Sequence, residues 1–121
     1  MIYFKELSDK IIGLAIEVHM SLGNGFLEKV YENALMIELQ ERGLKAESQV
    51  PISVQYKKRE VGGYFADIVV EDEVILELKA VESLQKIHEA QILNYLKATD
   101  YKVGFLVNFT HPKAIIRRFV L

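Results

Sequence analysis

Three charged residues interrupt two apolar, strand-like segments of the sequence. Asp67 lies in "YFADIVV", and Glu77 and Lys79 lie in "VILELKA". Residues two apart in a strand point to the same face, about 6.6 Å apart, so Glu77 and Lys79 share a face. Two carboxylates and one ammonium group leave an excess of negative charge, which a divalent cation with oxygen ligands would neutralise. The pattern therefore predicts a site for a hard metal ion.

The turn between the two segments decides whether Asp67 joins this site. A two-residue loop would direct the Asp67 side chain away from Glu77, whereas a three-residue loop, residues 71–73, would pair Val70 with Val74 and set Asp67 opposite Glu77. We expect the three-residue loop, or a bulge of equal effect, because it gathers the charges on one patch. It also leaves these residues for the core: Ala66, Ile68, Val70, Val74, Leu76 and Leu78.

A buried ion pair is the structural alternative for the same charges. Glu77 would then pair with Lys79, with Asp67 or an arginine beside them. Desolvating each charge costs several kcal/mol, and a buried pair often contributes no more stability than apolar residues would. The metal site is therefore the favoured interpretation.

The composition fits one compact domain spanning residues 1–121. Half of the residues are hydrophobic and 26% are charged. Cysteine is absent, which excludes disulfides, thiol nucleophiles and thiolate metal sites. The net charge of -2 argues against a simple basic nucleic-acid binder, although a bound divalent cation would reverse the sign locally.

The N-terminal sequence "MIYFKELSDK" lacks the basic-then-apolar layout of a signal peptide. No apolar run approaches the length of about 20 residues that spans a bilayer. We therefore expect a cytoplasmic protein that makes no membrane contact.

Hydrophobic periodicity predicts the order ααβββαββ, an α/β sandwich in which a mixed sheet is flanked by helices. The expected helices cover residues 7–22, 27–39 and a third segment that Ser83 caps and that runs to about Thr99; the expected strands cover residues 48–56, 63–70, 74–80, 101–109 and 114–121. Pro51 indicates that the first strand lies at an edge. Gly43 is expected to end the second helix.

Asp67 followed by Glu77-x-Lys79 on the next strand resembles the D...(D/E)xK signature of the PD-(D/E)XK nuclease superfamily. Ala66 stands where the proline of that name would be, a position that carries no chemistry. The superfamily core is a helix, a three-stranded meander, another helix and a further strand, an order that the predicted elements match. This resemblance implies a restriction-endonuclease-like fold.

Two further motifs strengthen the resemblance. "GFLEKVY" places Gly25, Glu28 and Tyr31 in the pattern of the GxxExxY family, which is grouped with these nucleases, and this likeness covers almost the whole chain. "QILNY" places Gln91 and Tyr95 in the QxxxY pattern of the exonuclease branch associated with recombination helicases.

The resemblance implies metal-dependent cleavage of phosphodiester bonds in DNA. Asp67 and Glu77 would ligate Mg²⁺ or Mn²⁺, with the Leu78 carbonyl as a further ligand, and Glu28 would reach the metal from the second helix. Lys79 would contact the attacking water or the scissile phosphate. A structural alternative exists for Glu28, since with Gly25 as N-cap it would occupy the third helical position and favour the helix dipole.

Gln91, Tyr95 and His88 fall on one face of the third predicted helix. The resemblance implies that Gln91 and Tyr95 line the cleft and hold the substrate strand. His88 either contacts phosphate or is an ordinary half-exposed histidine.

The expected function is that of a small Mg²⁺-dependent or Mn²⁺-dependent nuclease that acts on DNA with little sequence preference of its own. A targeting partner protein or a homodimer would then direct it to its substrate. The alternative is a catalytically inactive binding or assembly module that keeps the nuclease fold.

Overall fold

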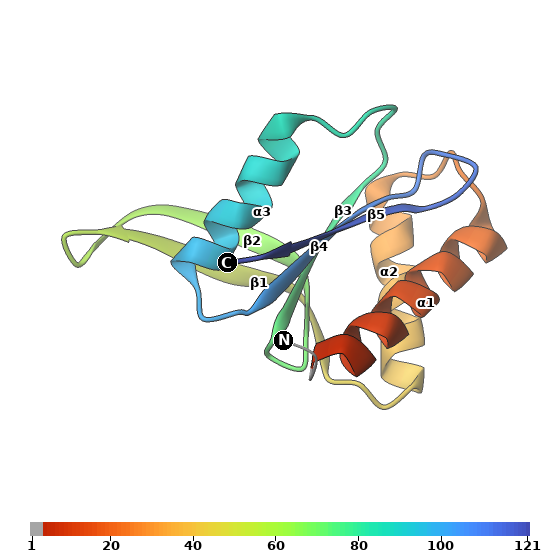
Figure 1. Cartoon of the computed structure of the whole chain (residues 1–121), viewed down its shortest axis with the longest axis horizontal. Coiled ribbons are helices and arrows are strands. Elements are labelled where there is room, and N and C mark those ends of the chain that lie inside the picture. The colour runs from red at the N-terminus through yellow and green to blue at the C-terminus, as the bar shows by residue number, and fades with distance from the viewer. Residues whose placement is uncertain (1–3) are drawn as a thin grey trace.

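The computed structural model describes residues 4–121 as a five-stranded sheet with helices on both faces (Figure 1). The elements are α1 (Lys5–Leu22), α2 (Glu28–Glu41), β1 (Ala46–Tyr56), β2 (Arg59–Val70), β3 (Val74–Lys79), α3 (Lys86–Ala98), β4 (Val103–Asn108) and β5 (Ile115–Val120). The predicted order ααβββαββ is confirmed.

The strands lie in the order β1-β2-β3-β4-β5. The β3–β4 pair is parallel and the other pairs are antiparallel, so the sheet is mixed, as expected. The parallel pair needs a crossover connection, which α3 provides. The first strand is an edge strand, as Pro51 indicated.

Each face of the sheet is covered by helices that bury apolar side chains. In Figure 1, α1 and α2 lie on one side of the sheet and α3 lies on the other. Ile68, Leu76 and Phe105 pack in the α1–α2 layer, while Val69 and Ile75 pack with the residues of α3. The alternation of side chains along β2 and β3 thus supplies both cores.

The turn between β2 and β3 has the register that gathers the charged residues. Val70 pairs with Val74, and the Glu73 N–H donates to the Val70 carbonyl at 3.0 Å. Glu71 and Asp72 carry φ angles of 53° and 55°, which make the tight turn. The three-residue loop is therefore confirmed, and the residues assigned to the core are all buried: Ala66, Ile68, Val70, Val74, Leu76 and Leu78.

The predicted cap of α3 was wrong, and so was the cap assumed in the structural alternative for Glu28. The N-cap of α3 is Gln85 instead of Ser83, because the His88 ring nitrogen Nδ1 accepts the Gln85 N–H at 3.0 Å and so satisfies a donor at the start of the helix. The N-cap of α2 is Leu27 instead of Gly25, so Glu28 is the first helical residue and not the third.

No helix within residues 4–121 has the length and hydrophobicity needed to cross a bilayer.

Candidate active site

The site lies where β2 separates from β3. The backbone pairing ends at Ile68 with Leu76. Beyond this pair, hydrogen bonds between backbone N–H groups and side-chain carboxylates connect the two strands. The Asp67 N–H donates to Glu77 Oε1 at 3.0 Å, and the Leu78 N–H donates to Asp67 Oδ2 at 2.8 Å. Both carboxylates are therefore fixed at the opening between the two strands.

Burial and mutual repulsion disfavour the ionised carboxylates. Glu77 is only 5% exposed, and burial together with the Asp67 charge raises the pKa of Glu77 to about 8. Burial also raises the pKa of Asp67, to which the charge of Glu32 contributes. The site thus carries more negative charge than its surroundings stabilise.

Lys79 lies two residues beyond Glu77, at the end of β3, and is partly buried. Its charge acts to lower the pKa of both carboxyl groups. In residues 4–121, however, Lys79 makes no ion pair with either carboxylate. The Lys79 ammonium group therefore lies near the two carboxylates without forming a salt bridge to either of them.

Asn108, which sequence reasoning missed, fixes the segment that follows Lys79. Its buried side chain accepts the Val81 N–H at 3.1 Å and donates to the Val81 carbonyl at 2.8 Å. The Phe109 N–H donates to the Lys79 carbonyl at 3.0 Å. The detectable signal was an asparagine inside the apolar run "GFLVNF", since a buried amide must find partners.

Two acidic residues of α2 act on this region: Glu28, the predicted metal ligand, and Glu32, which was not predicted. Glu28 is exposed, and it acts on the site through its charge, which raises the pKa of Glu77. Glu32, one turn later, is 4% exposed; it pairs with Lys29 at 2.7 Å and accepts from Gln49 Nε2 at 3.0 Å. The i,i+4 spacing of the two glutamates was the signal that would have found Glu32.

Gln49 joins α2 to the site. Its Nε2 donates to Glu32 Oε1 and, at 3.4 Å, to Asp67 Oδ1. The residue has a φ of 53°, in the left-handed region that residues other than glycine rarely adopt. A neutral amide therefore bridges two carboxylates that would otherwise repel one another, at some cost in backbone strain.

The remaining residues of the GxxExxY motif hold the α1–α2 loop. The Tyr31 hydroxyl donates to the Gly23 carbonyl at 2.6 Å, and its ring stacks on Phe109 with centroids 4.3 Å apart. Gly25 has a φ of 103°, which favours glycine. His19 stacks on Phe109 and donates from Nε2 to the His111 carbonyl at 2.7 Å. These contacts lock the loops beside the start of α2.

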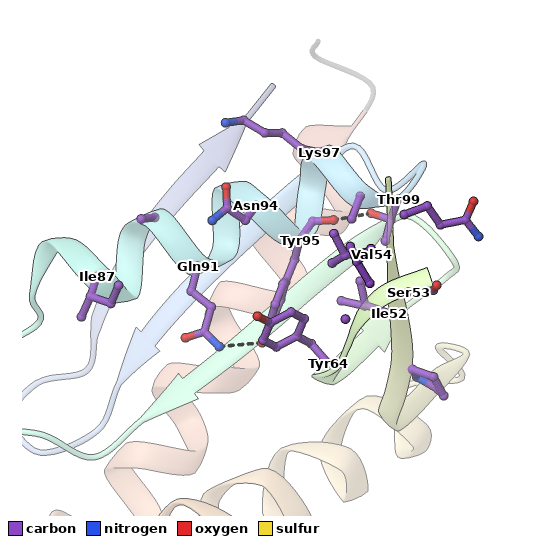
Figure 2. A pocket seen from close by; sticks show the side chains of 16 residues that line it. Ile52, Ser53, Val54, Tyr64, Ile87, Gln91, Asn94, Tyr95, Lys97 and Thr99 are labelled. Atoms are coloured by element: carbon purple, nitrogen blue, oxygen red, sulfur yellow. Dashed lines mark hydrogen bonds between the residues drawn. The ribbon is translucent and has the colours of Figure 1, made fainter. Parts of the chain in front are cut away.

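The third helix brings Gln91 and Tyr95 to the same region. Figure 2 shows the two side chains joined by a hydrogen bond, in which Gln91 Nε2 donates to the Tyr95 hydroxyl oxygen at 2.6 Å. Burial raises the pKa of Tyr95, and the nearby charges of Glu77 and Asp67 raise it further. A neutral phenol therefore lies close to the paired carboxylates.

His88 is half-buried at the start of α3, where its bond to the Gln85 N–H gives it a structural role. A contact between His88 and phosphate stays a prediction.

The carboxylates fit a divalent cation in their chemistry. Their oxygens are the ligands that hard cations prefer, and a cation would favour the ionised form that burial disfavours. Within residues 4–121, no three His, Asp or Glu side chains converge closely enough to form a complete metal site by themselves. Asp67 and Glu77 would hold such an ion with help from water or substrate oxygens.

A mixed sheet with helices on both faces thus opens onto two carboxylates and a lysine, the residues of the D...(D/E)xK signature. A sequence model described as the PD-(D/E)XK nuclease superfamily matches residues 5–119. The chain belongs to this superfamily.

The fold has a counterpart among solved structures. The protein of the "Crystal structure of SSO0001" superposes with a TM-score of 0.57 at 19% sequence identity, over 76% of this chain. The chain spans 48% of the length of that protein, so the likeness concerns the fold alone. The restriction-endonuclease-like architecture is confirmed. A search among curated proteins finds no significant match.

Proposed function

We propose that the protein is a divalent-metal-dependent nuclease that hydrolyses phosphodiester bonds in DNA, with little sequence preference of its own. The observation that carries this proposal is a pair of hydrogen bonds where β2 and β3 separate. The Asp67 N–H donates to the Glu77 carboxylate and the Leu78 N–H donates to the Asp67 carboxylate, which holds the two acids together beside Lys79. Membership of the PD-(D/E)XK nuclease superfamily supports it.

Each residue has a role that follows from its chemistry. Asp67 and Glu77 would hold Mg²⁺ or Mn²⁺, and such an ion would supply activation of water near neutral pH. The Lys79 ammonium group is a point charge that stabilises negative charge developing on the scissile phosphate. Because no salt bridge occupies it in residues 4–121, Lys79 is available to a phosphate oxygen. Gln91 and Tyr95 orient the strand.

Glu28 and Glu32 act from outside the carboxylate pair. Glu28 contributes negative charge from an exposed position, which would favour a cation at the carboxylate pair. Glu32 acts through Gln49 on Asp67. These two glutamates divide between them the role that was predicted for Glu28 alone.

The test is incubation of the protein with end-labelled single-stranded and double-stranded DNA, and with RNA, in Mg²⁺, Mn²⁺ or EDTA. Cleavage is expected with either metal and not with EDTA. The Lys79→Ala variant is expected to cleave about 100-fold more slowly or worse, because a charge that meets the transition state is lost. The matched control is Lys10→Ala, an exposed lysine of α1.

Cleavage of no substrate with either metal, or equal rates for wild type and Lys79→Ala, would contradict the proposal. In the first case the protein would be the binding module with a nuclease fold that the sequence left as an alternative. Membership of the GxxExxY family, a cytoplasmic location, a homodimer and a targeting partner stay predictions.

A further inference from the structure

A groove of about 1200 Å³ runs between α3 and the outer part of the β1–β2 hairpin. We call it the α3 groove; Figure 2 shows its lining side chains, which come from β1, β2, α3 and the residues that follow α3. Drug-sized ligands occupy pockets of roughly 300–1,000 Å³. The groove is therefore suited to an extended ligand.

The hairpin that forms one wall projects beyond the rest of the sheet (Figure 1). The recorded β1–β2 pairing continues to Tyr56 with Arg59, whereas the β2–β3 pairing stops at Ile68 with Leu76. Within residues 4–121, no second strand pairs with β2 over residues 59–65, so the outer half of the hairpin, residues 51–65, stands apart from β3. We call this half the β1–β2 arm.

Aromatic and apolar side chains are exposed inside the groove. Tyr64 of the β1–β2 arm is 48% exposed, and its ring lies 5.6 Å from that of Tyr95, tilted by 45°. Val61 and Ile87, on opposite walls, are 62% and 67% exposed. An unpaired nucleobase has a flat apolar face that such side chains bind, and base–aromatic stacking is worth about 1–3 kcal/mol per base. Bases in a duplex are stacked on each other and do not offer this face.

The charge of the groove favours a polyanion although the protein is acidic overall. The chain contains 17 Asp and Glu residues, yet among the described residues, 4–121, none of them lines the groove, and Lys97 is the charged residue that does. Lys57, Lys58 and Arg59 form the tip of the arm, with Glu60 beside them. None of these four basic residues forms an ion pair within residues 4–121, so their charge is available to phosphates.

The turn at the arm tip is made by residues that are poorly suited to it. Lys57 and Lys58 have φ angles of 50° and 64°. Such two-residue hairpin turns favour Asn-Gly, and each left-handed residue with a Cβ costs roughly 1–2 kcal/mol. Strained positions of this kind are often functional, and here the strain places two cations at the tip of the arm, between the lining residues Gln55 and Val61 in the sequence.

The groove leads to the carboxylates. Tyr95 and Gln91 line it, and Tyr95 packs in one buried cluster with Ala66, the neighbour of Asp67, so the inner end of the groove lies close to the candidate active site. A strand bound along α3 would therefore present its backbone to that site.

We propose that the α3 groove and the β1–β2 arm bind single-stranded DNA, with an unpaired base stacked on Tyr64 and phosphates held by Lys57, Lys58 and Lys97. This inference rests on the proposed function, from which it takes DNA as the substrate, and it adds that the strand is unpaired when it reaches Asp67 and Glu77.

The test measures binding in EDTA, where cleavage does not occur. Fluorescence anisotropy is followed for a labelled single-stranded DNA oligomer, the matched duplex and an RNA oligomer of the same sequence. The single-stranded DNA is expected to bind at least tenfold more tightly than the duplex. The Tyr64→Ala variant is expected to weaken binding about tenfold, which corresponds to about 1.4 kcal/mol of stacking. The matched control is Phe65→Ala, because Phe65 is 57% exposed on the same strand but does not line the groove.

The basic tip is tested with the double variant Lys57→Asn, Lys58→Gly, which relieves the turn while removing both charges. Its thermal stability is expected to rise while its affinity for single-stranded DNA falls. The slope of log K against log salt concentration is expected to flatten by about 1.4, since each phosphate contact on a single strand contributes about 0.7. The control Lys10→Ala is expected to change neither the affinity nor the slope.

Duplex or RNA bound more tightly than single-stranded DNA, or equal affinities for Tyr64→Ala and Phe65→Ala, would overturn the inference whether or not the protein cleaves. Conversely, a protein that binds as described but cleaves nothing in Mg²⁺ or Mn²⁺ would contradict the proposed nuclease function and leave the binding surface established.

Discussion

Asp67 and Glu77 are joined through the backbone as well as through their charges. The Asp67 N–H donates to Glu77 Oε1 at 3.0 Å, so the residue that repels the Glu77 carboxylate also supplies its hydrogen bond. Two like charges are thereby held near one another in a buried place. This arrangement is costly without a cation, and three of the four predictions below follow from it.

Glu77→Gln is expected to stabilise the metal-free protein at pH 8. The folded protein raises the pKa of Glu77 from 4.5 to about 8, so the folded state binds more protons than the unfolded state between these values. The free energy of unfolding therefore falls as the pH rises from 4.5 towards 8, and the raised pKa of Asp67 acts in the same direction. The glutamine variant removes the Glu77 contribution and is expected to gain about 1–3 kcal/mol at pH 8 and little at pH 4.5.

Urea unfolding in EDTA at both pH values measures this difference. The control is Glu60→Gln, an exposed acid on β2, which is expected to change stability equally at both pH values. A Glu77→Gln variant that is less stable than the wild type at pH 8 would show that Glu77 is not destabilised by burial.

Asp67→Ala is expected to abolish the binding of Mn²⁺. Isothermal titration calorimetry of the wild type at pH 8 is expected to show one binding event, whose enthalpy depends on the buffer because Glu77 releases a proton when the metal binds. The affinity of the wild type for Mn²⁺ is expected to fall as the pH is lowered from 8 to 6. Asp72→Ala removes an exposed aspartate from the same hairpin and is the control for a general loss of negative charge. Unchanged Mn²⁺ binding by Asp67→Ala would place the metal elsewhere.

Gln49 is a positioning residue, because it acts on the site through its hydrogen bonds to Asp67 and Glu32. Gln49→Leu is expected to raise the dissociation constant for Mn²⁺ about tenfold, as the loss of a residue that supports a metal ligand does. Gln49→Gly is informative as well, since glycine adopts a φ of 53° readily. The Gln49→Gly variant is expected to weaken Mn²⁺ binding although it relieves the backbone strain at this position.

The control for Gln49 is Gln55→Leu, an exposed glutamine on the same strand. If Gln49→Leu and Gln55→Leu bound Mn²⁺ equally well, the amide bridge would have no role in holding Asp67.

Gly104→Ala is expected to displace α3 from the sheet. A Cβ on Gly104 would lie 2.8 Å from Ile92 Cδ1 and 2.9 Å from Ile92 Cγ1, and Ile92 is fully buried and cannot move aside. Overpacking of this kind costs about 1–3 kcal/mol. Because Gln91 and Tyr95 are carried by the same helix, cleavage of DNA is expected to slow as well.

Gly13→Ala is the matched control for Gly104→Ala. Nothing lies within 4 Å of a Cβ at this helical position, so the substitution is expected to stabilise the protein by about 1 kcal/mol. Thermal unfolding and the cleavage rate measure both variants. Equal stability of the two would mean that α3 packs less tightly over β4 than the contact at Gly104 indicates.

The contrast between Glu28 and Glu32 shows where prediction of the site from sequence ended. Both glutamates lie on the same side of α2, and the motif drew attention to the first. Which one is buried depends on how α2 packs against the sheet, and the predicted start of the helix at residue 27 did not settle this. Gln49 was invisible for a related reason, since its left-handed backbone and its two carboxylate partners arise only from tertiary contacts.

The sequence by itself determined the order of the elements and favoured the β2–β3 register that brings Asp67 to Glu77. These follow from the period of apolar residues and from the length of one turn, which are local properties of the chain. Only the tertiary structure decided that Lys79 stays free of an ion pair in residues 4–121, that Asn108 fixes the end of β3, and that the β1–β2 arm stands apart from β3 to leave the α3 groove. These features depend on distances between segments far apart in the chain, which periodicity and motif spacing do not specify.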